Sequence, residues 1–190
     1  YNYVNGKNEL CGKVTLLKSE PEIEKGFFDI VVACEVLEHI EDDLQALENW
    51  NFYLKDNGFL LISVPAHQKR WDCNDIYSGH YRRYEKESLN KLLIKAGFRP
   101  HLFYSYDFPS CILLDPIRSK SAERLHSTPA NMELSKEELT KVSGIKRDQN
   151  KLFRIFSNKK LLYPLIKFQE LFYHLDWGSA YIVLCQKVTR

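Results

Sequence analysis

The sequence contains few cysteines, and their arrangement excludes two common uses of this residue. All five stand far apart, and no two of them form a Cys-x-x-Cys pair. Their positions are Cys11, Cys34, Cys73, Cys111 and Cys185. An odd number of scattered cysteines argues against both a disulfide framework and a structural zinc knuckle. We therefore expect a protein of a reducing compartment, which predicts a cytoplasmic location.

Long apolar runs are also missing from the chain. No run approaches the roughly 18 apolar residues that a membrane-spanning helix needs, and no signal peptide is evident. The formal net charge of +2 neither favours nor excludes nucleic acid as a partner. The 190 residues, 44% hydrophobic and 27% charged, are enough for one soluble domain with an added subdomain.

Glycine is scarce, with 8 residues in the chain, and the two nearest the N-terminus, Gly6 and Gly12, stand alone. The sequence therefore has no glycine-rich turn at its beginning. It also opens on Tyr1 instead of methionine, which predicts either a processed chain or a piece of a longer one.

Apolar runs and helical patterns alternate along the chain. The expected strands are 11–20, 27–36, 59–65, 98–108 and 178–188, and the expected helices are 41–58 and 85–98. The runs at 27–36 and 59–65 are continuously apolar, which is typical of strands buried on both faces of a parallel sheet. A strand-helix-strand series of this kind predicts parallel pairing with right-handed crossovers, and hence an α/β sheet.

Two segments interrupt this alternation. Residues 66–84 are polar and aromatic without a clear period, which predicts a long functional loop. Residues 111–175 read as a helical and irregular insertion, whose part 151–175 is amphipathic, basic and interrupted around Pro164. This stretch is either a lid over an acceptor site or a surface for peripheral membrane contact. We expect an α/β domain formed by 1–110 and 176–190, with 111–175 as the insertion.

The hexapeptide EVLEHI follows directly on the buried run FDIVVAC. Glu35, Glu38 and His39 stand at offsets 0, 3 and 4, which would place them on one face of a helical turn. Such a cluster can bind a metal ion or line a substrate. The alternative is structural, because acidic residues near a helix start are favoured by the dipole, and His39 could simply hydrogen-bond a loop carbonyl.

The stretch FDIVVACEVLEHI, together with LKDNGFLLISVP, resembles the second half of class I S-adenosylmethionine-dependent methyltransferases. GHYRRYEKESLNKLLIKAGF resembles the next segment of a bacterial branch often encoded beside sugar transferases, and LDWGSAYIVLCQK resembles the closing strand. The resemblance covers about 11–110 and 176–188. It implies a Rossmann-like, mostly parallel sheet that lacks its first strands, with a helical insertion before the last strand.

The resemblance also implies donor-binding residues, although the glycine-rich donor turn of the family is missing here. By position, Ser19 and Glu20 resemble the pair that lies against the adenine of S-adenosylmethionine. Cys34 and Glu35 resemble residues that line the sulfonium side of the donor pocket. Without the glycine-rich turn, a chain of this sequence should bind the donor poorly.

Two metal-using branches of the family share the spacing Glu35-x-x-Glu38-His39 and supply a further histidine, to which His80 corresponds. These are the small-RNA 3′-end 2′-O-methyltransferases and the ubiquinone-pathway catechol O-methyltransferases. The implied ligand set is Glu35, Glu38, His39 and His80, and it suits Mg²⁺, Mn²⁺ or Zn²⁺. A bound ion would activate an acceptor hydroxyl. Many relatives keep a similar motif with no metal, so a donor-side or substrate-side role for these residues stays open.

The remaining candidates lie after the second buried run. His67 is a candidate general base, with His39 as a second catalytic candidate, because a histidine pKa suits proton abstraction near neutral pH. The alternative for His67 is a structural one, in which this loop histidine caps the next turn. An aromatic and basic cluster is the candidate acceptor site, where arginines could clamp phosphate or carboxylate groups, or where aromatic residues merely hold the loop down. Its members are Trp71, His80, Tyr81, Arg82 and Arg83.

Three functions follow from these observations. The first is S-adenosylmethionine-dependent methyl transfer to an oxygen or nitrogen atom of a small, glycan-related or lipid-linked acceptor. The second is metal-dependent 2′-O-methylation of RNA. The third is a catalytically inactive, methyltransferase-like binding module, which the missing glycine-rich turn favours if the chain is a whole protein.

Overall fold

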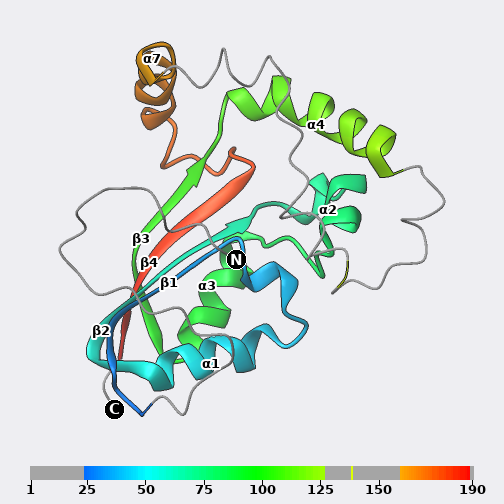
Figure 1. The fold of residues 1–190 in the computed structure, drawn as a ribbon. Helices are drawn as coiled ribbons and strands as arrows, with labels where there is room; N and C mark the ends of the chain where they lie inside the picture. The colour runs from blue at the N-terminus through cyan, green and yellow to red at the C-terminus, as the bar shows by residue number, and fades with distance from the viewer. Residues whose placement is uncertain (1–23, 127–137, 139–158, 189–190) are drawn as a thin grey trace, which may run out of the picture.

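A computed structural model of the chain describes residues 24–126, 138 and 159–188, and these build a four-stranded sheet in the order β1-β2-β4-β3 (Figure 1). The strands are β1 Phe28–Cys34, β2 Leu54–Pro65, β3 Phe98–Tyr106 and β4 Ala180–Lys187. β1 pairs parallel with β2, whereas β4 runs antiparallel to both of its neighbours, β2 and β3. Three strands therefore point the same way and only the closing strand is reversed. The expected Rossmann-like, mostly parallel α/β sheet is confirmed. The strand expected at 11–20 lies outside the described residues.

The hydrophobic core lies between one face of the sheet and two helices, α1 (Asp43–Tyr53) and α3 (Lys86–Lys95). Alternation along β2 turns Leu60, Ile62 and Val64 toward these helices, and all three are fully buried. Leu47 of α1 and Leu89 of α3 are fully buried against them. Packing on this face therefore holds the carboxyl ends of the strands in place.

Two predicted boundaries were wrong. The helix expected at 41–58 ends at Tyr53, and β2 begins at Leu54 instead of at residue 59. Leu54 is fully buried and pairs with Phe28 of β1, so burial and pairing draw this segment into the strand. The Asn57-Gly58 pair, expected to end the helix, lies within the strand, where Asn57 has a φ of 61°. The next helix and strand, expected at 85–98 and 98–108, are shorter by a few residues.

The segment 66–84 is not a structureless loop. It contains a 3-10 turn, η2 (Gln68–Arg70), and the short helix α2 (Cys73–Ser78). A capping box starts α2. The Asp72 side chain accepts a hydrogen bond from a backbone N–H of the first turn, and the Asp75 side chain accepts one from the backbone N–H of Asp72. The spacing Asp-x-x-Asp is the sequence signal that could have predicted this helix.

Two further helices, α4 (Ser110–His126) and α7 (Lys159–Glu170), lie beyond the end of β3 (Figure 1). α4 packs against α2, and the Arg70 guanidinium donates to the Trp177 carbonyl, 2.9 Å away, which ties this end together. The interruption expected around Pro164 was wrong, since α7 continues through it. Pro164 lies inside the helix, where its ring nitrogen cannot donate a backbone hydrogen bond. Residues 139–158 lie outside the described part of the chain.

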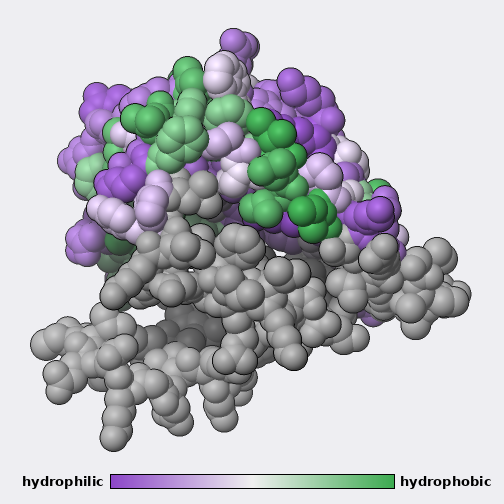
Figure 2. Space-filling model, turned by 90° about the horizontal axis from the view of Figure 1, so that it is seen from above, coloured by the Kyte–Doolittle hydropathy of each residue, from purple (hydrophilic) through white to green (hydrophobic). Residues whose placement is uncertain are grey.

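Apolar side chains are exposed at this end of the molecule. They include Leu113 and Ile117 on α4 and Phe168 on α7, with Leu171 and Trp177 following α7. Figure 2 looks onto this end and shows hydrophobic patches set among hydrophilic ones. Within the described residues, no helix combines the length and the apolar character needed to cross a bilayer.

Gly178, just before β4, provides a test of how closely the chain packs against the end of β3. A Cβ at this position would lie 2.1 Å from the Tyr106 carbonyl oxygen and 2.5 Å from Ser105 Oγ. We expect Gly178→Ala to lower the free energy of unfolding by about 1–3 kcal/mol, because backbone atoms must move to admit the methyl group. Chemical denaturation measures this change.

Gly26→Ala is the control for this experiment. Its Cβ would meet no atom closer than 3.8 Å, so only the strain of its φ of +71° applies, at a cost of about 1 kcal/mol. A Gly178→Ala variant as stable as the wild type would show that β3 and β4 do not approach as closely as described.

Candidate functional site

The carboxyl ends of β1, β2 and β3 meet at one edge of the sheet, and hydrogen bonds join them there. Glu35 follows directly on β1, Ser63 lies near the end of β2, and Tyr106 is the last residue of β3. Ser63 Oγ donates to Glu35 Oε1 at 2.7 Å, and the Tyr106 hydroxyl donates to the same oxygen at 3.3 Å. These three residues are named the strand-end cluster. Ligands of open α/β sheets bind at this edge, so the cluster marks a candidate site.

Glu35 itself is exposed and carries an unusual backbone conformation. Its φ is 53°, and its N–H donates to the Ser63 carbonyl at 3.0 Å. The helical turn η1 begins only at Leu37 and ends at His39. The single helical face expected for Glu35, Glu38 and His39 is therefore wrong, because Glu35 lies outside the turn and its carboxylate is bonded toward β2 and β3.

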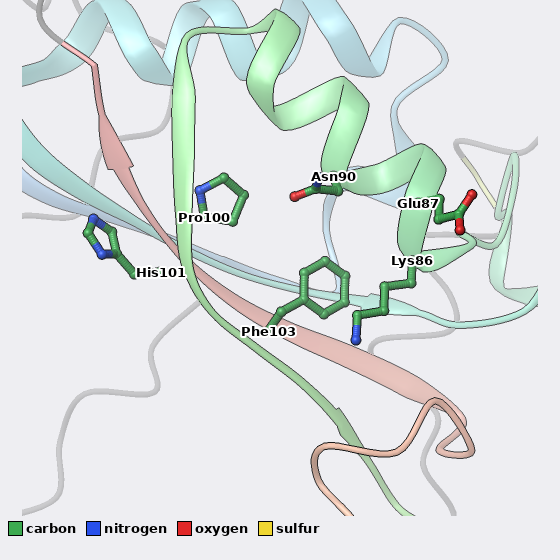
Figure 3. Close-up of a pocket in the computed structure, with 6 residues that line it drawn as sticks. All are labelled: Lys86, Glu87, Asn90, Pro100, His101 and Phe103. Carbon is green, nitrogen blue, oxygen red and sulfur yellow. The ribbon is translucent and has the colours of Figure 1, made fainter.

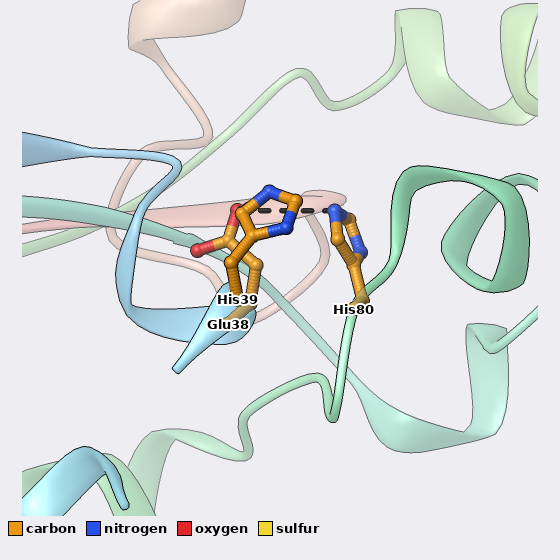
Figure 4. Close-up of side chains that lie close together, drawn as sticks. All are labelled: Glu38, His39 and His80. Carbon is orange, nitrogen blue, oxygen red and sulfur yellow. Dashed lines mark ion pairs between the residues drawn. The ribbon is translucent and has the colours of Figure 1, made fainter. Parts of the chain in front are cut away.

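A second group of side chains lies beside the strand-end cluster. Glu38 is fully buried, and neither of its carboxylate oxygens has a hydrogen-bond partner. Its Oε1 lies 3.9 Å from His39 Nε2 and 4.0 Å from His80 Nε2 (Figure 4). The two imidazole rings are 4.7 Å apart and nearly perpendicular. We name Glu38, His39 and His80 the buried triad. The structure thus brings together three of the four residues predicted as metal ligands and leaves Glu35 outside this group.

Asp75 holds one member of the buried triad in a fixed orientation. This carboxylate is almost completely buried in α2, and its Oδ1 lies 2.8 Å from His80 Nδ1. It also accepts hydrogen bonds from Arg83 Nε at 2.9 Å and forms an ion pair with Arg83 Nη2 at 2.8 Å. Because Nδ1 of His80 is occupied by Asp75, its Nε2 is the nitrogen that faces Glu38.

Burial sets the protonation of these groups. Loss of solvent, followed by the charge of Glu35, raises the pKa of Glu38 from 4.5 to about 8. Burial, followed by the charge of His80, lowers the pKa of His39. Burial disfavours ionisation of Asp75, but hydrogen bonds from His80 and Arg83 outweigh it and lower the Asp75 pKa. At neutral pH without a ligand, Glu38 therefore holds a proton while Asp75 is charged.

The Tyr106 hydroxyl remains a donor throughout the physiological pH range. Burial, and then the neighbouring charge of Glu35, raise the pKa of Tyr106 well above its ordinary value. A protonated tyrosine donates to the Glu35 carboxylate instead of competing with it for protons. Neither Ser63 nor Tyr106 was predicted from the sequence, although both stand at the ends of predicted strands, which is the one signal that could have found them.

His67 lies buried between two carboxylates, away from the buried triad. Its Nδ1 is 3.2 Å from Glu85 Oε2 and its Nε2 is 3.5 Å from Asp176 Oδ1. The side chain is 7% exposed, and its ring packs edge-on against Tyr181. Both ring nitrogens thus face groups of the chain itself. A general-base role for His67 stays an untested prediction, and its surroundings favour a structural one.

The predicted acceptor cluster is divided by the structure. Arg82 pairs with Asp43 at 2.7 Å, and Arg83 pairs with Asp75, so each guanidinium has a carboxylate partner within the chain. The Tyr81 N–H donates to the Glu38 carbonyl at 2.8 Å, which fastens this segment to η1. Trp71 ends the η2 turn and is partly buried. Acceptor binding by these residues stays a prediction. His80 is the one member of the predicted acceptor cluster that belongs to the buried triad.

The predicted donor residues are only partly covered by the structure. Ser19 and Glu20 lie outside the described residues. Cys34 is an exposed free thiol at the last position of β1, next to Glu35. Its place at the carboxyl edge is the one that the resemblance predicts, while its role is untested.

An aromatic hollow opens on the face of the sheet opposite α1 and α3. It has a volume of about 390 Å³ between β3, β4 and α7. Its lining residues are Tyr104, Tyr106, Ile166, Gln169, Tyr173 and Ile182. Tyr106 belongs both to this hollow and to the strand-end cluster, so the two adjoin. The sequence analysis missed the hollow because its walls come from three distant segments.

A second hollow, of about 440 Å³, lies on the other face of β3, against α3 (Figure 3). Lys86 and Phe103 line it, with the Lys86 ammonium 5.4 Å from the centre of the Phe103 ring. Alternation along β3 places Phe103 on the opposite face from Tyr104 and Tyr106. This hollow is therefore separate from the strand-end cluster.

Residues 9–102 match the family model of a methyltransferase domain. The comparison with curated proteins found no match. Among solved structures, the SpnF cyclase is 16% identical to the chain with a TM-score of 0.50, covering 90% of this chain and 53% of the cyclase. A Bacillus halodurans protein assigned to the methyltransferases is 15% identical with a TM-score of 0.49, covering 90% of this chain and 74% of that protein.

Phosphoethanolamine N-methyltransferase 2 of Haemonchus contortus, solved with S-adenosylmethionine, is 18% identical with a TM-score of 0.45, covering 88% of this chain and 35% of that enzyme. This chain thus spans little more than half of the cyclase and about a third of the Haemonchus enzyme. Structural likeness at such identities shows the fold alone. A cyclase shares that fold, so the reaction must be argued from the site.

Glu38 makes stability depend on pH in a direction opposite to most carboxylates. Its pKa in the folded chain, about 8, exceeds its ordinary 4.5, so folding favours the protonated form. This contribution is complete below about pH 4.5 and is lost as the pH rises toward 8. A glutamine cannot ionise, so Glu38→Gln should not lose stability as the pH rises. We therefore expect this variant to be more stable than the wild type by on the order of a few kcal/mol at pH 8.

Urea denaturation over this pH range, with a chelator present, measures the effect. Glu48→Gln, an exposed exchange on α1, is the control and should follow the wild type at every pH. A constant stability difference between Glu38→Gln and the wild type across the range would contradict a raised pKa for Glu38.

Proposed function

Because the chain belongs to the methyltransferase domain family of the class I, S-adenosylmethionine-dependent type, we propose that it moves a methyl group to an oxygen or nitrogen atom of a small, glycan-related or lipid-linked acceptor. The strand-end cluster of Glu35, Ser63 and Tyr106 is the single observation that supports this most strongly. It places a carboxylate at the edge of the sheet where ligands of this fold class bind.

The chemistry of the cluster suits a positively charged donor. S-adenosylmethionine supplies an activated methyl group on a sulfonium and carries a second positive charge on its α-ammonium. Glu35 is exposed, and no ion pair joins it to a cation within 24–126, 138 and 159–188. Its carboxylate is held by two hydroxyl donors, so its position is set before a ligand arrives. Ser19, Glu20 and Cys34 remain the further donor-side candidates.

The aromatic hollow is the proposed acceptor side of the site. It adjoins the strand-end cluster through Tyr106, so an acceptor bound there would lie beside the donor carboxylate. Methyl transfer is a direct displacement on carbon, and positioning therefore supplies most of the acceleration. Aromatic and aliphatic walls bind the apolar part of an acceptor, and exposed apolar residues on α4 and α7 favour a lipid-linked molecule.

The insertion 111–175 is proposed as the lid of this acceptor site. Its described helices support the proposal, since α7 contributes Ile166 and Gln169 to the hollow and α4 packs against α2. Peripheral membrane contact through 151–175 is the alternative, in which the exposed side chains of Phe168 and Leu171 would face a lipid surface. A small-molecule acceptor and a lipid-linked one are distinguished by whether vesicles bind the protein.

A second candidate function is metal-dependent 2′-O-methylation of RNA, which the buried triad favours. Two imidazoles and one carboxylate can hold a divalent cation that activates a hydroxyl. The third candidate, an inactive binding module, predicts that no donor binds. Label transfer from S-adenosylmethionine by the full-length protein, with glycan, lipid-linked and 3′-hydroxyl RNA acceptors, separates all three.

We expect Glu35→Gln to weaken the binding of S-adenosylmethionine to the full-length protein about tenfold, because a charge-assisted contact becomes a neutral one. Tyr106→Phe should weaken it about threefold by releasing the carboxylate. Isothermal titration calorimetry measures both changes.

Glu48→Gln makes the same exchange on the exposed face of α1 and should bind the donor as the wild type does. Equal affinities for Glu35→Gln and Glu48→Gln would remove Glu35 from the donor site. A wild-type protein that gives no heat with S-adenosylmethionine would instead establish the inactive module.

A further inference from the structure

His67 lies between two segments that are far apart in the sequence, the segment 66–84 after β2 and the return of the chain from α7 to β4. We propose that His67 is a positioning residue, whose doubly protonated ring fastens the end of the insertion 111–175 to the start of the segment 66–84. The contact itself does not depend on methyl transfer, whereas its consequence for acceptor binding rests on the proposed function.

The partners of the His67 ring are both carboxylates. Its Nδ1 lies 3.2 Å from Glu85 Oε2, and its Nε2 lies 3.5 Å from Asp176 Oδ1. An ionised carboxylate only accepts hydrogen bonds, and a neutral imidazole carries a proton on one nitrogen alone. A neutral ring would therefore turn a lone pair toward one of the two negative charges. Only the doubly protonated, cationic ring attracts both partners at once.

The two carboxylates are themselves held in place. Oε1 of Glu85 accepts a hydrogen bond from the Gln68 N–H at 3.0 Å, and Oδ1 of Asp176 accepts one from the Tyr181 hydroxyl. Burial, followed by this hydrogen bond, raises the pKa of Tyr181 well above its ordinary value, so its hydroxyl stays a donor. In the described part of the chain, the titratable groups that face the ring are thus Glu85, Asp176 and Tyr181. Histidine is the member of this set whose charge ordinarily changes between about pH 5 and pH 8.

The backbone of His67 is held in a conformation that residues with a side chain rarely adopt. Its φ is 62° and its ψ is 99°. The His67 N–H donates to the Tyr84 carbonyl at 2.8 Å, and the His67 carbonyl accepts from the Arg70 N–H at 2.8 Å. Strained conformations persist only where the surroundings fix them, and they cluster at functional sites. Here the fixed backbone sets the ring between Glu85 and Asp176.

Two further contacts join the same two stretches, 66–70 and 176–179. The Ala66 N–H donates to the Ser179 carbonyl at 2.8 Å, and Arg70 Nη2 donates to the Trp177 carbonyl at 2.9 Å. Backbone groups and an arginine do not change their charge near neutral pH. The ion pair between His67 and Asp176 is therefore the contact whose strength follows the charge of the ring.

The fastened segment contributes one wall of the aromatic hollow. Tyr173, which lines the hollow, precedes Asp176 closely, and its carbonyl accepts a hydrogen bond from the Ser105 N–H at 2.9 Å. Loss of the charge on His67 would release the chain at Asp176 and let this wall move. In the proposed function, an acceptor would then bind more weakly above neutral pH than below it.

Nitrogen-15 NMR of the full-length protein with labelled histidines tests the charge of the ring, with His67→Gln identifying its signals. We expect both ring nitrogens of His67 to carry protons at about pH 6. A histidine that is merely packed, with 7% of its side chain exposed, would be neutral at this pH because burial disfavours the charged form. A His67 ring with one unprotonated nitrogen at about pH 6 would overturn the proposal.

Hydrogen–deuterium exchange of the full-length protein measures the fastening. Relative to intrinsic rates at the same pH, the protection of amides in 171–176 should fall about threefold between about pH 6 and pH 8.5, because a partly exposed ion pair is lost as the ring becomes neutral. His67→Gln and Asp176→Asn should each remove this dependence on pH. Asp176→Asn keeps the shape of the side chain, so it decides the question even if His67→Gln does not fold.

Two variants serve as matched controls. His174→Gln removes an exposed imidazole from the same segment, and His101→Gln removes one from β3; both should keep the dependence of the wild type on pH. A dependence that survives in Asp176→Asn, or that disappears in His174→Gln, would overturn the proposal. Neither experiment uses a methyl donor or an acceptor, so its failure and a failure of the proposed methyl transfer are distinguishable.

Discussion

Two hydrogen bonds to one carboxylate oxygen organise the edge of this sheet. Ser63 and Tyr106 both donate to Glu35 Oε1, and through it they join the ends of β1, β2 and β3. The contact requires the core on the other face to hold the strands in register, and it requires Glu35 to leave β1 with a positive φ. In return it fixes a negative charge at the place where this fold class binds its ligands. The proposed donor side, the aromatic hollow and the buried triad all adjoin this edge.

Two carboxylates three residues apart thus have different surroundings, which suit different proposed roles. Glu35 is exposed and satisfied by hydroxyl donors, whereas Glu38 is buried and has none. Loss of solvent, and then the charge of Glu35, raise the pKa of Glu38 and so favour its protonated form, unless a cation takes the place of the proton. One group suits a cationic donor, and the other suits an ion that could activate an acceptor.

The sequence predicted the order of the elements well, because apolar runs and helical spacing reflect burial directly. The boundary at Leu54 was mispredicted since Leu47, Trp50, Tyr53 and Leu54 continue a helical spacing, and only pairing with Phe28 shows where the strand begins. Within the site, spacing identified Glu38 and His39, and the resemblance added His80. Their separation from Glu35 depends on one backbone angle that no spacing rule contains. Ser63 and Tyr106 meet Glu35 only through the sheet order β1-β2-β4-β3, so a local pattern could not reveal them.

Hydrogen–deuterium exchange of the full-length protein, with and without S-adenosylmethionine, tests the central claim most directly. If the carboxyl edge of the sheet meets the donor, the ligand should slow exchange in peptides that cover 34–40 and 104–108. Peptides of α3 should keep their exchange rates, because α3 packs against the core face of the sheet, which is opposite the aromatic hollow. Donor-dependent protection confined to α3, with none at 34–40 or 104–108, would contradict the account.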